Sequence, residues 1–486
     1  MLLITVLLGY EVIRYFVRMR SNLPPGPTPL PIVGNLLELR KADRLYKAAI
    51  GYSNRYKSDV IKIDFGLMGY AVILNSYNAF KKAFLEDIDL MSDRIMTHTF
   101  KIFTRNGKDI ALAPVSEQWK IRRKLGYQTF RMIAEGDKIS IFSASSFKKQ
   151  KLLMLQQLNV LVNPRKMLAF GVINAISKLT YGKEYEINDE EFEFLNELGE
   201  QLIDIVGNGT IIDIFPLLSF LPINSTKRLK KIVDRSEEII MRNFRLHEES
   251  FDENEIRNIS DAIIKLRISS KFSKDVTDEN IFFLIFNIFG AGTDTPVNIL
   301  NWMIIYVCNN SEIQQKVYEE LSSFACEGNP PNWHDREKLP YTQAFMHELL
   351  RLSSVTPLGI PHKPSTDCKF MGYDISKESI VLPNIYAIHR DPQYWKDPEV
   401  FNPERFFDEN GRVSHIQESY FPFGLGRRVC LGESIARPLL FNFISNLLYT
   451  FEFYVPEEHP MPTLEGMENQ ALYIPDPNYK VAYRLR

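Results

Sequence analysis

The chain has 486 residues, 45% of them hydrophobic, and its 33 phenylalanines and 22 tyrosines predict a large aromatic core. Its 58 basic and 60 acidic side chains give a formal net charge of −2, so no cationic surface for nucleic acid is expected. The four cysteines, Cys308, Cys326, Cys368 and Cys430, form no Cys-x-x-Cys pair, which argues against a disulfide framework or a zinc site.

Residues 1–20 are predicted to be an N-terminal membrane anchor. They are mostly apolar up to a group of arginines (Arg14, Arg18 and Arg20), and no small-residue cleavage site follows. The positive-inside bias of these arginines predicts a catalytic domain that faces the cytoplasm. Because the apolar stretch is shorter than a typical span, a helix lying in the membrane interface is the alternative.

Residues 21–36 are rich in proline and are predicted to form a stiff hinge between the anchor and one catalytic domain at 37–486. The alternative is a proline-rich ligand for a signalling domain, but the position between anchor and globular domain favours the hinge.

Alternating apolar residues at Val60 to Phe65 and Ala71 to Leu74 predict strands, whereas most of the remaining chain has helical periodicity. The fold class is therefore mainly α with small β-sheets (α+β). Thr277 to Val307 is predicted to be one very long helix that begins at Thr277 as N-cap. Its apolar part resembles a second membrane span, but Asp294 near the centre favours a helix buried in a large soluble domain.

A glycine-rich loop near the carboxyl end contains Phe423, Gly426, Arg428, Cys430 and Gly432 in the pattern F-x-x-G-x-R-x-C-x-G. Glycine tolerates positive φ and lets the backbone run close to a flat ligand. A lone cysteine is usually a small buried hydrophobe. Here five positions in ten residues match one known loop pattern in which the cysteine is a thiolate ligand for iron.

This loop resembles the haem-binding loop of the cytochrome P450 family, in which a cysteine thiolate holds haem iron. Other segments are similar to family motifs and follow in the expected order, namely Trp119 and Arg123 (W-x-x-x-R), Ala291 to Thr295 (the oxygen-activation motif), Glu348 and Arg351 (E-x-x-R), and Arg405. The resemblance covers nearly the whole chain after the hinge. It implies the cytochrome P450 fold, with haem b buried between the long central helix and the Cys430 loop.

The resemblance also implies roles for individual residues. Cys430 would be the axial iron ligand, and the haem would be held by Arg428, Phe423, Gly426, Gly432, Trp119, Arg123 and His362. Asp294 and Thr295 would deliver protons and hold bound oxygen. Glu348, Arg351 and Arg405 would form a structural triad whose loss prevents haem incorporation.

Two prolines depart from the family pattern. Pro296 has no N–H for the Gly292 carbonyl, so a kink is expected in the oxygen groove, with the freed carbonyl available to Thr295 or water. Pro438 is expected to make the helix after the ligand loop start late or bend.

The resembled fold implies an apolar substrate lining and therefore a lipophilic substrate such as a steroid, fatty acid or xenobiotic. Each lining residue has plain core packing as its alternative. The expected lining consists of Ile110, Phe286, Phe289, Ala291, Val355, Leu358, Ile360, Leu472 and Tyr473. Leu217, Leu218, Phe220 and Leu221 are expected to contact the membrane.

A monooxygenase that uses O₂ and takes electrons from NADPH through a flavoprotein, the NADPH-cytochrome P450 reductase, is the function that the resemblance implies. The family resemblance places it in the endoplasmic reticulum membrane. A basic stripe at Lys120, Arg122 and Lys124 is a candidate docking face for the reductase, or a plain solvated face. The alternatives are a haem-thiolate isomerase or dehydratase acting on a peroxide, and a non-catalytic haem sensor.

Overall fold

The structure, a computed structural model, describes Gly9 and residues 22–41, 44–134, 136–207, 209–214, 223–269, 273–326, 328–414, 416–467 and 472–486. The predicted anchor, apart from Gly9, lies outside these residues, and so does the predicted membrane contact at Leu217, Leu218, Phe220 and Leu221. Across the part of the chain that is described, no helix combines the length and the apolar character needed to cross a membrane.

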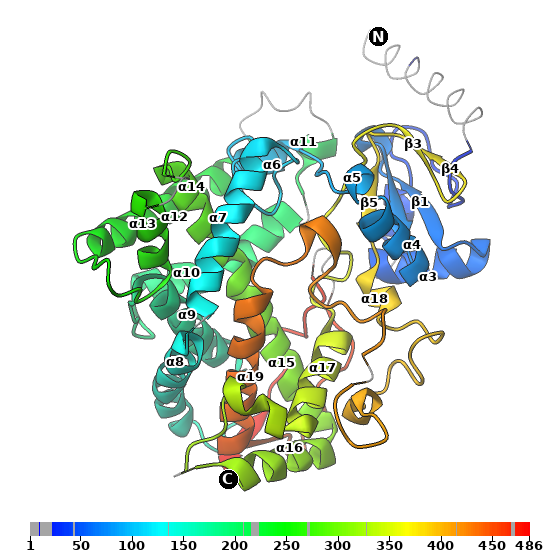
Figure 1. The fold of residues 1–486 in the computed structure, drawn as a ribbon. Coiled ribbons are helices and arrows are strands. Elements are labelled where there is room, and N and C mark those ends of the chain that lie inside the picture. Colours follow the sequence, from blue (N-terminus) through cyan, green and yellow to red (C-terminus); the bar gives the residue numbers. More distant parts are fainter. Residues whose placement is uncertain are drawn as a thin grey trace.

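Helices dominate the molecule, as the sequence predicts (Figure 1). The α-helices are α2 (Leu36–Leu39), α3 (Leu45–Tyr56), α4 (Tyr77–Lys81), α5 (Ile88–Met91), α6 (His98–Phe103), α7 (Glu117–Ala134), α8 (Lys138–Leu155), α9 (Arg165–Tyr181), α10 (Glu190–Leu202), α11 (Ile211–Ile214), α12 (Asn224–Glu248), α13 (Ile259–Ser269), α14 (Asp278–Gly292), α15 (Asp294–Asn309), α16 (Ser311–Phe324), α17 (Pro340–Ser353), α18 (Ile385–Ile388) and α19 (Glu433–Thr450). Short 3₁₀ segments include Trp333–Lys338, Pro403–Phe406 and Gly426–Arg428, and π-helical turns occur at Lys82–Glu86 and Ile203–Gly207.

The strands form three small sheets at the edges of the helical body. They are β1 (Val60–Asp64), β2 (Tyr70–Leu74), β3 (Cys368–Phe370), β4 (Tyr373–Ile375), β5 (Ile380–Pro383), β6 (Phe451–Tyr454) and β7 (Ala482–Leu485). In the first sheet β2 pairs antiparallel with β1 and parallel with β5, and the other sheets are the antiparallel pairs β3–β4 and β6–β7. The predicted strands in residues 60–65 and 71–74 are thus confirmed.

The described part of the proline-rich segment lies against β1. The Lys62 amide donates to the Pro25 carbonyl at 2.9 Å, and a Cβ on Gly26 would stand 1.9 Å from the Lys62 carbonyl oxygen. Farther along, the Asn35 side chain accepts from the Asp64 amide at 2.9 Å. These contacts hold the described part of the segment against the first sheet.

The prediction of one continuous helix from Thr277 to Val307 is wrong at its centre. Thr277 does cap the segment, since its hydroxyl accepts from the Asn280 amide at 3.3 Å, but α14 ends at Gly292 and α15 begins at Asp294. Pro296 explains the break. In an uninterrupted helix it would lie in the interior, whereas after the break it is the third residue of α15, where an N–H has no intrahelical partner.

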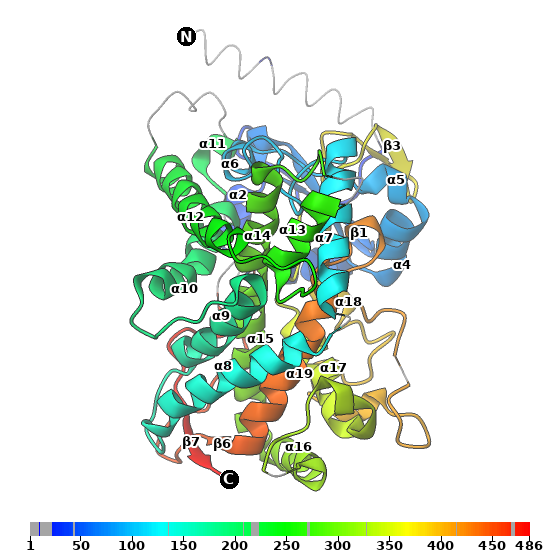
Figure 2. The same ribbon diagram turned by 60° about the vertical axis from the view of Figure 1, so that its left-hand side comes forward.

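The two halves α14 and α15 run through the middle of the molecule in both views (Figures 1 and 2). They are buried along almost their whole length, with α9 and α10 on one side and α17 and α19 on another side of α15. This arrangement sets residues 290–295, at the junction of α14 and α15, close to the molecular centre. The Cys430 loop leads directly into α19.

Candidate active site

The loop before α19 is fixed by its own backbone and by one close approach. Cys430 donates its backbone N–H to the Phe423 carbonyl at 2.9 Å, which closes the loop. Gly424 and Gly426 adopt φ values of +74° and +76°, in the left-handed region that glycine tolerates. At Gly426 a Cβ would stand 2.2 Å from the Phe84 carbonyl oxygen, so this glycine lets the loop lie against residues 82–86.

The Cys430 thiol lies at the start of α19. Burial raises the pKa of this thiol, while the backbone N–H groups of Gly432 and Glu433 point at the sulfur and act in the opposite direction. A coordinating metal removes the thiol proton outright, and these N–H groups then stabilise the thiolate. The Phe423 ring lies near the loop, with the Arg437 guanidinium 4.8 Å from its centroid. A cavity of about 600 Å³ borders Cys430 between α7 and α19.

Arginines from distant parts of the sequence converge near the loop. Arg428 stacks 3.9 Å from the centroid of the Trp119 ring and donates to the Ser92 and Ala113 carbonyls at 2.9 and 2.8 Å. Arg123, one turn along α7 from Trp119, donates to the Val429 carbonyl at 2.6 Å. The Nδ1–H group of His362 donates to the Met91 carbonyl at 2.9 Å.

Arg94 completes this cationic cluster, and the sequence motifs did not reveal it. Its guanidinium is buried and donates to the Ile360 and Pro361 carbonyls at 2.7 and 3.0 Å, next to His362. No recognised motif includes Arg94. Its carbonyl partners bring it into the cluster, namely Ala111 at 3.1 Å and two residues of a segment more than 260 positions away.

The cluster carries more positive charge than its surroundings neutralise. Burial and neighbouring arginines lower the pKa of Arg94 well below its ordinary value and that of Arg428 to about 10. Burial, Arg94 and Arg428 likewise lower the pKa of His362. In the described chain, no ion pair joins Arg94, Arg123 or Arg428 to a carboxylate. Since guanidinium groups stay protonated, this cluster fits a dianionic ligand such as the two propionates of haem.

Glu348, Arg351 and Arg405 form a buried ionic knot. Arg351 bonds Glu348 in a bidentate manner, with two N–O distances of 2.8 Å, and Arg405 Nε lies 3.0 Å from the same carboxylate. Arg351 also donates to the His389 and Pro398 carbonyls at 2.6 and 2.8 Å. The knot therefore ties α17 to the irregular segment that precedes the Cys430 loop.

The junction of α14 and α15 presents accessible residues on a mostly buried helix pair. Ala291 is exposed, and Gly290, Gly292 and Thr295 are half-buried. The Thr295 hydroxyl donates to the Ala291 carbonyl at 2.6 Å, so the expected acceptor at Gly292 is not the one used. Asp294 is buried and points toward α9 and α10, where it pairs with Arg165 at 2.8 Å. Burial raises the pKa of the Asp294 carboxyl, and Arg165 opposes this rise.

The predicted substrate lining divides into two groups. Ala291, Val355 and Ile360 retain accessible surface, and Phe286 packs against the half-buried Phe103 at 5.3 Å between ring centroids. Ile110, Leu358 and Leu472 are buried.

Phe289 and Tyr473 have the contacts of core residues. Phe289 stacks on Tyr181 at 5.7 Å, and Tyr473 stacks on Trp302 at 4.7 Å. These contacts are typical of core residues, and the prediction that the two residues line the substrate site stays a prediction.

Two further predictions need correction. Of the two effects expected of Pro438, the late start is wrong, since α19 begins at Glu433 and continues through Pro438, and the bend stays a prediction. The basic stripe on α7 is not one solvated face, because Arg122 is half-buried and donates to Asn280 Oδ1 and to the Gly107 carbonyl, each at 2.9 Å. Lys120 pairs with Glu117 at 2.7 Å, and Lys124 is exposed.

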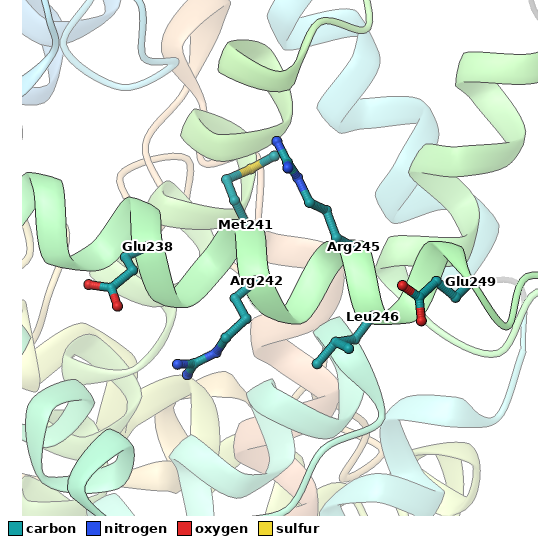
Figure 3. A pocket seen from close by; sticks show the side chains of 6 residues that line it. All are labelled: Glu238, Met241, Arg242, Arg245, Leu246 and Glu249. Carbon is teal, nitrogen blue, oxygen red and sulfur yellow. The ribbon is translucent and has the colours of Figure 1, made fainter.

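A second hollow, of about 420 Å³, lies on the surface of α12 near its C-terminal end and is lined by none of the predicted site residues. Figure 3 shows that its side chains come from the last turns of this one helix and from Glu249 just beyond it. Arg242 and Arg245 already pair with Glu191 and Asp278. Within the described residues, no group of three or more His, Cys, Asp or Glu side chains is arranged to hold a metal ion.

Comparison with known proteins agrees with this geometry. A family model described as Cytochrome P450 matches residues 24–483. A steroid 17-alpha-hydroxylase/17,20 lyase of Ictalurus punctatus is 33% identical over 96% of this chain and 91% of its own length, and a cytochrome P450 1A1 of Sparus aurata is 31% identical over 94% and 91%. A solved zebra fish cytochrome P450 structure with progesterone is 27% identical, with a TM-score of 0.80 over 90% of this chain and 99% of that chain.

Proposed function

Because the chain belongs to the cytochrome P450 family and is a monooxygenase of that family, we propose that it hydroxylates a rigid lipophilic substrate of steroid size. The observation that carries the proposal is similarity over nearly the full length to steroid 17-alpha-hydroxylase/17,20 lyases and to a structure with progesterone. The accessible residues Ala291, Val355 and Ile360 are apolar, which suits such a substrate.

The cofactor that we propose is haem b. Cys430 would bind its iron, and Arg94, Arg123, Arg428, Trp119 and His362 would hold its propionates. Bound haem supplies the activation of O₂, while the chain supplies orientation and protons. Gly432 would leave the backbone free to approach the macrocycle, since a Cβ there would stand 4.0 Å from the Cys430 sulfur, whereas Gly426 makes room for the Phe84 carbonyl.

Proton supply on the distal side is assigned to Asp294 and Thr295. Thr295 would hold a water molecule beside the Ala291 carbonyl, with which its hydroxyl is already bonded. Asp294 would exchange protons with solvent from the α9 and α10 side, where its carboxylate lies.

Electrons would come from NADPH through a flavoprotein reductase. The cavity beside Cys430 is lined by Arg123, Arg131 and Arg437 together with the exposed Tyr127. Glu433 of the same lining pairs with Arg437 at 2.8 Å, so the face that would meet the reductase close to the ligand loop keeps a net positive charge. We place residues 1–20 in the endoplasmic reticulum membrane as an anchor, with residues 37–486 as the catalytic domain on the cytoplasmic side.

Ligand-induced spectral change tests the substrate class. The haem-loaded protein would be titrated with progesterone, with lauric acid and with a planar polycyclic hydrocarbon, and products would be identified by mass spectrometry after addition of NADPH and reductase. We expect progesterone to give the tightest spin-state change and a hydroxylated product. A planar hydrocarbon as the preferred substrate would instead favour a xenobiotic oxidase, the second candidate, which the similarity to cytochrome P450 1A1 supports.

A further inference from the structure

Asp109 lies in the interior beside the cationic cluster and belongs to none of the recognised motifs. It is fully buried in the segment that connects α6 to α7. Its Oδ2 atom accepts from the backbone N–H groups of Ala111 and Leu112 at 3.1 and 2.9 Å. Its Oδ1 atom has no hydrogen-bond partner among the residues that the structure describes. Because a buried carboxylate oxygen without a partner is costly, the neighbouring charges must account for this position.

The backbone of residues 109–113 has different partners for its N–H and its carbonyl groups. The N–H groups of residues 111 and 112 bond Asp109, whereas three carbonyl groups accept from side chains of the haem site. The three acceptors are the carbonyls of Ile110, Ala111 and Ala113, and their donors are Trp119 Nε1 at 2.9 Å, Arg94 Nε at 3.1 Å and Arg428 Nη2 at 2.8 Å, respectively. Asp109 therefore orders the short stretch of backbone that holds both arginines.

Asp109 also acts on the charge of the cluster. Burial raises the pKa of its carboxyl, while the N–H groups of residues 111–113 and the Arg428 guanidinium oppose that rise. Asp109 in turn favours the charged forms of Arg94 and Arg428, which burial and neighbouring arginines disfavour. The half-buried Asp93 acts on the same two arginines in the same direction. Asp109 thus supplies negative charge from the interior side of the cluster.

We propose that Asp109 is a positioning residue of the haem site, where it orders the backbone of residues 110–113 and supplies an internal negative charge. The inference rests on the proposed haem cofactor, whose propionates Arg94 and Arg428 would hold. The ordered backbone keeps the two guanidinium groups in place and so slows release of the cofactor. The negative charge disfavours the addition of an electron nearby, so it lowers the midpoint potential of the iron.

Asp109→Asn and Asp109→Ala separate the two contributions. Asparagine keeps an oxygen that can accept from Ala111 and Leu112 but carries no charge, whereas alanine removes both the acceptor and the charge. Both variants should raise the midpoint potential, measured by redox titration of the purified haem-loaded protein. Haem transfer to excess apomyoglobin should be about tenfold faster in Asp109→Ala than in the unchanged protein, and no faster in Asp109→Asn.

Amide exchange in the haem-loaded protein reports on the backbone directly. The N–H groups of residues 111 and 112 should exchange slowly in the unchanged protein and in Asp109→Asn, and rapidly in Asp109→Ala. Asp234→Asn is the matched control, because it removes an exposed carboxylate paired with Arg105 at 3.3 Å. It should change none of the three measurements, since Arg105 stays paired with Glu237.

The outcomes that would overturn the inference differ for its two parts. An unchanged midpoint potential in Asp109→Asn would show that the charge does not reach the iron. Slow exchange at residues 111 and 112 in Asp109→Ala, or rapid haem transfer from Asp109→Asn, would show that the acceptor does not order the site. If Asp109→Ala does not fold, Asp109→Asn still decides both parts. An unchanged protein that binds no haem would overturn the proposed cofactor and the inference with it.

Discussion

The Glu348 knot and the α14–α15 junction each contain a buried carboxylate paired with arginine, but the two carboxylates differ in the partners that hold them. In the knot, a buried carboxylate is bonded by two arginines and by the Asn402 amide at 2.9 Å, so it has little freedom to change partners. At the junction, Asp294 is bonded by one arginine, which it shares with Glu200, and by the Asn298 side chain at 3.0 Å, and the helix is interrupted at Thr293 beside it. The comparison shows that the carboxylate of the knot has more cationic partners than the carboxylate of the junction.

Removal of the Glu348 carboxylate should have the largest effect. Glu348→Ala leaves the buried Arg351 without its bidentate partner, and breaking such a pair costs about 3 to 5 kcal/mol. We expect the variant to fail to incorporate haem, as measured by the reduced carbon monoxide difference spectrum per mole of protein.

A nearby glutamate provides the control for this variant. Glu404 lies in the Pro403–Phe406 turn next to Arg405, but it pairs with Lys316 on the surface. Because exposed pairs contribute about 0 to 1 kcal/mol, Glu404→Ala should load haem normally. A fully haem-loaded Glu348→Ala protein would contradict the supporting role of the knot.

Substitutions at two glycines of the ligand loop distinguish the cost of a left-handed backbone from the cost of a steric clash. Gly424 and Gly426 have nearly the same φ, but an added Cβ meets nothing within 4 Å at Gly424 and the Phe84 carbonyl at 2.2 Å at Gly426. Gly424→Ala should therefore cost only the left-handed conformation, about 1 to 2 kcal/mol. Gly426→Ala should lose more stability and displace the loop, seen as a weaker thiolate-type carbon monoxide spectrum. Equal losses would show that the Phe84 contact is unimportant.

Acidification should lower the free energy of unfolding through the buried His389. Burial, and then the charges of Arg351 and Arg390, lower the pKa of His389 to about 3, whereas an unfolded histidine has a pKa near 6.5. The unfolded chain thus binds more protons between these values, and stability falls as the pH drops from about 6.5 toward 3, by about 1.4 kcal/mol per pH unit.

Denaturant unfolding of the haem-loaded protein at pH 7 and pH 5 measures this contribution. His389→Gln should reduce the loss of stability on acidification, and the exposed His459 supplies the control variant His459→Gln, which should not. An unchanged pH dependence in His389→Gln would assign the acid sensitivity to other groups.

Sequence patterns succeeded where short-range spacing determines geometry. The Cys430 loop contains its own closing hydrogen bond to Phe423, and Glu348 and Arg351 are neighbours on one helix, so motif and structure correspond directly. The fold class followed from the helical periodicity and a few short alternating segments. Aromatic residues in the C-terminal segment were less predictable, because the core position of Tyr473 depends on Trp302 of α15.

Long-range partners were not visible in the sequence. Arg94 joins the cationic cluster through carbonyl groups of a distant segment, and Arg165 reaches Asp294 from another helix. Neither belongs to a local pattern, and a single sequence contains no signal that pairs such positions. The kink expected from Pro296 was correct in location, but its form, an interruption at Thr293 alone that makes Pro296 a first-turn residue of α15, was not predicted from the sequence.

The smallest of the expected effects concerns that break. Pro296→Thr restores an N–H that can reach the Gly292 carbonyl, and it removes the ring that crowds this carbonyl. We expect the new amide at residue 296 to exchange slowly, because α14 and α15 then join. The peroxide fraction of NADPH consumption should change by a few-fold at most. Pro438→Ala is the matched control, since α19 is continuous through that proline. If residue 296 exchanges rapidly in Pro296→Thr, the packing of α15 against α9 and α10 maintains the break without the proline.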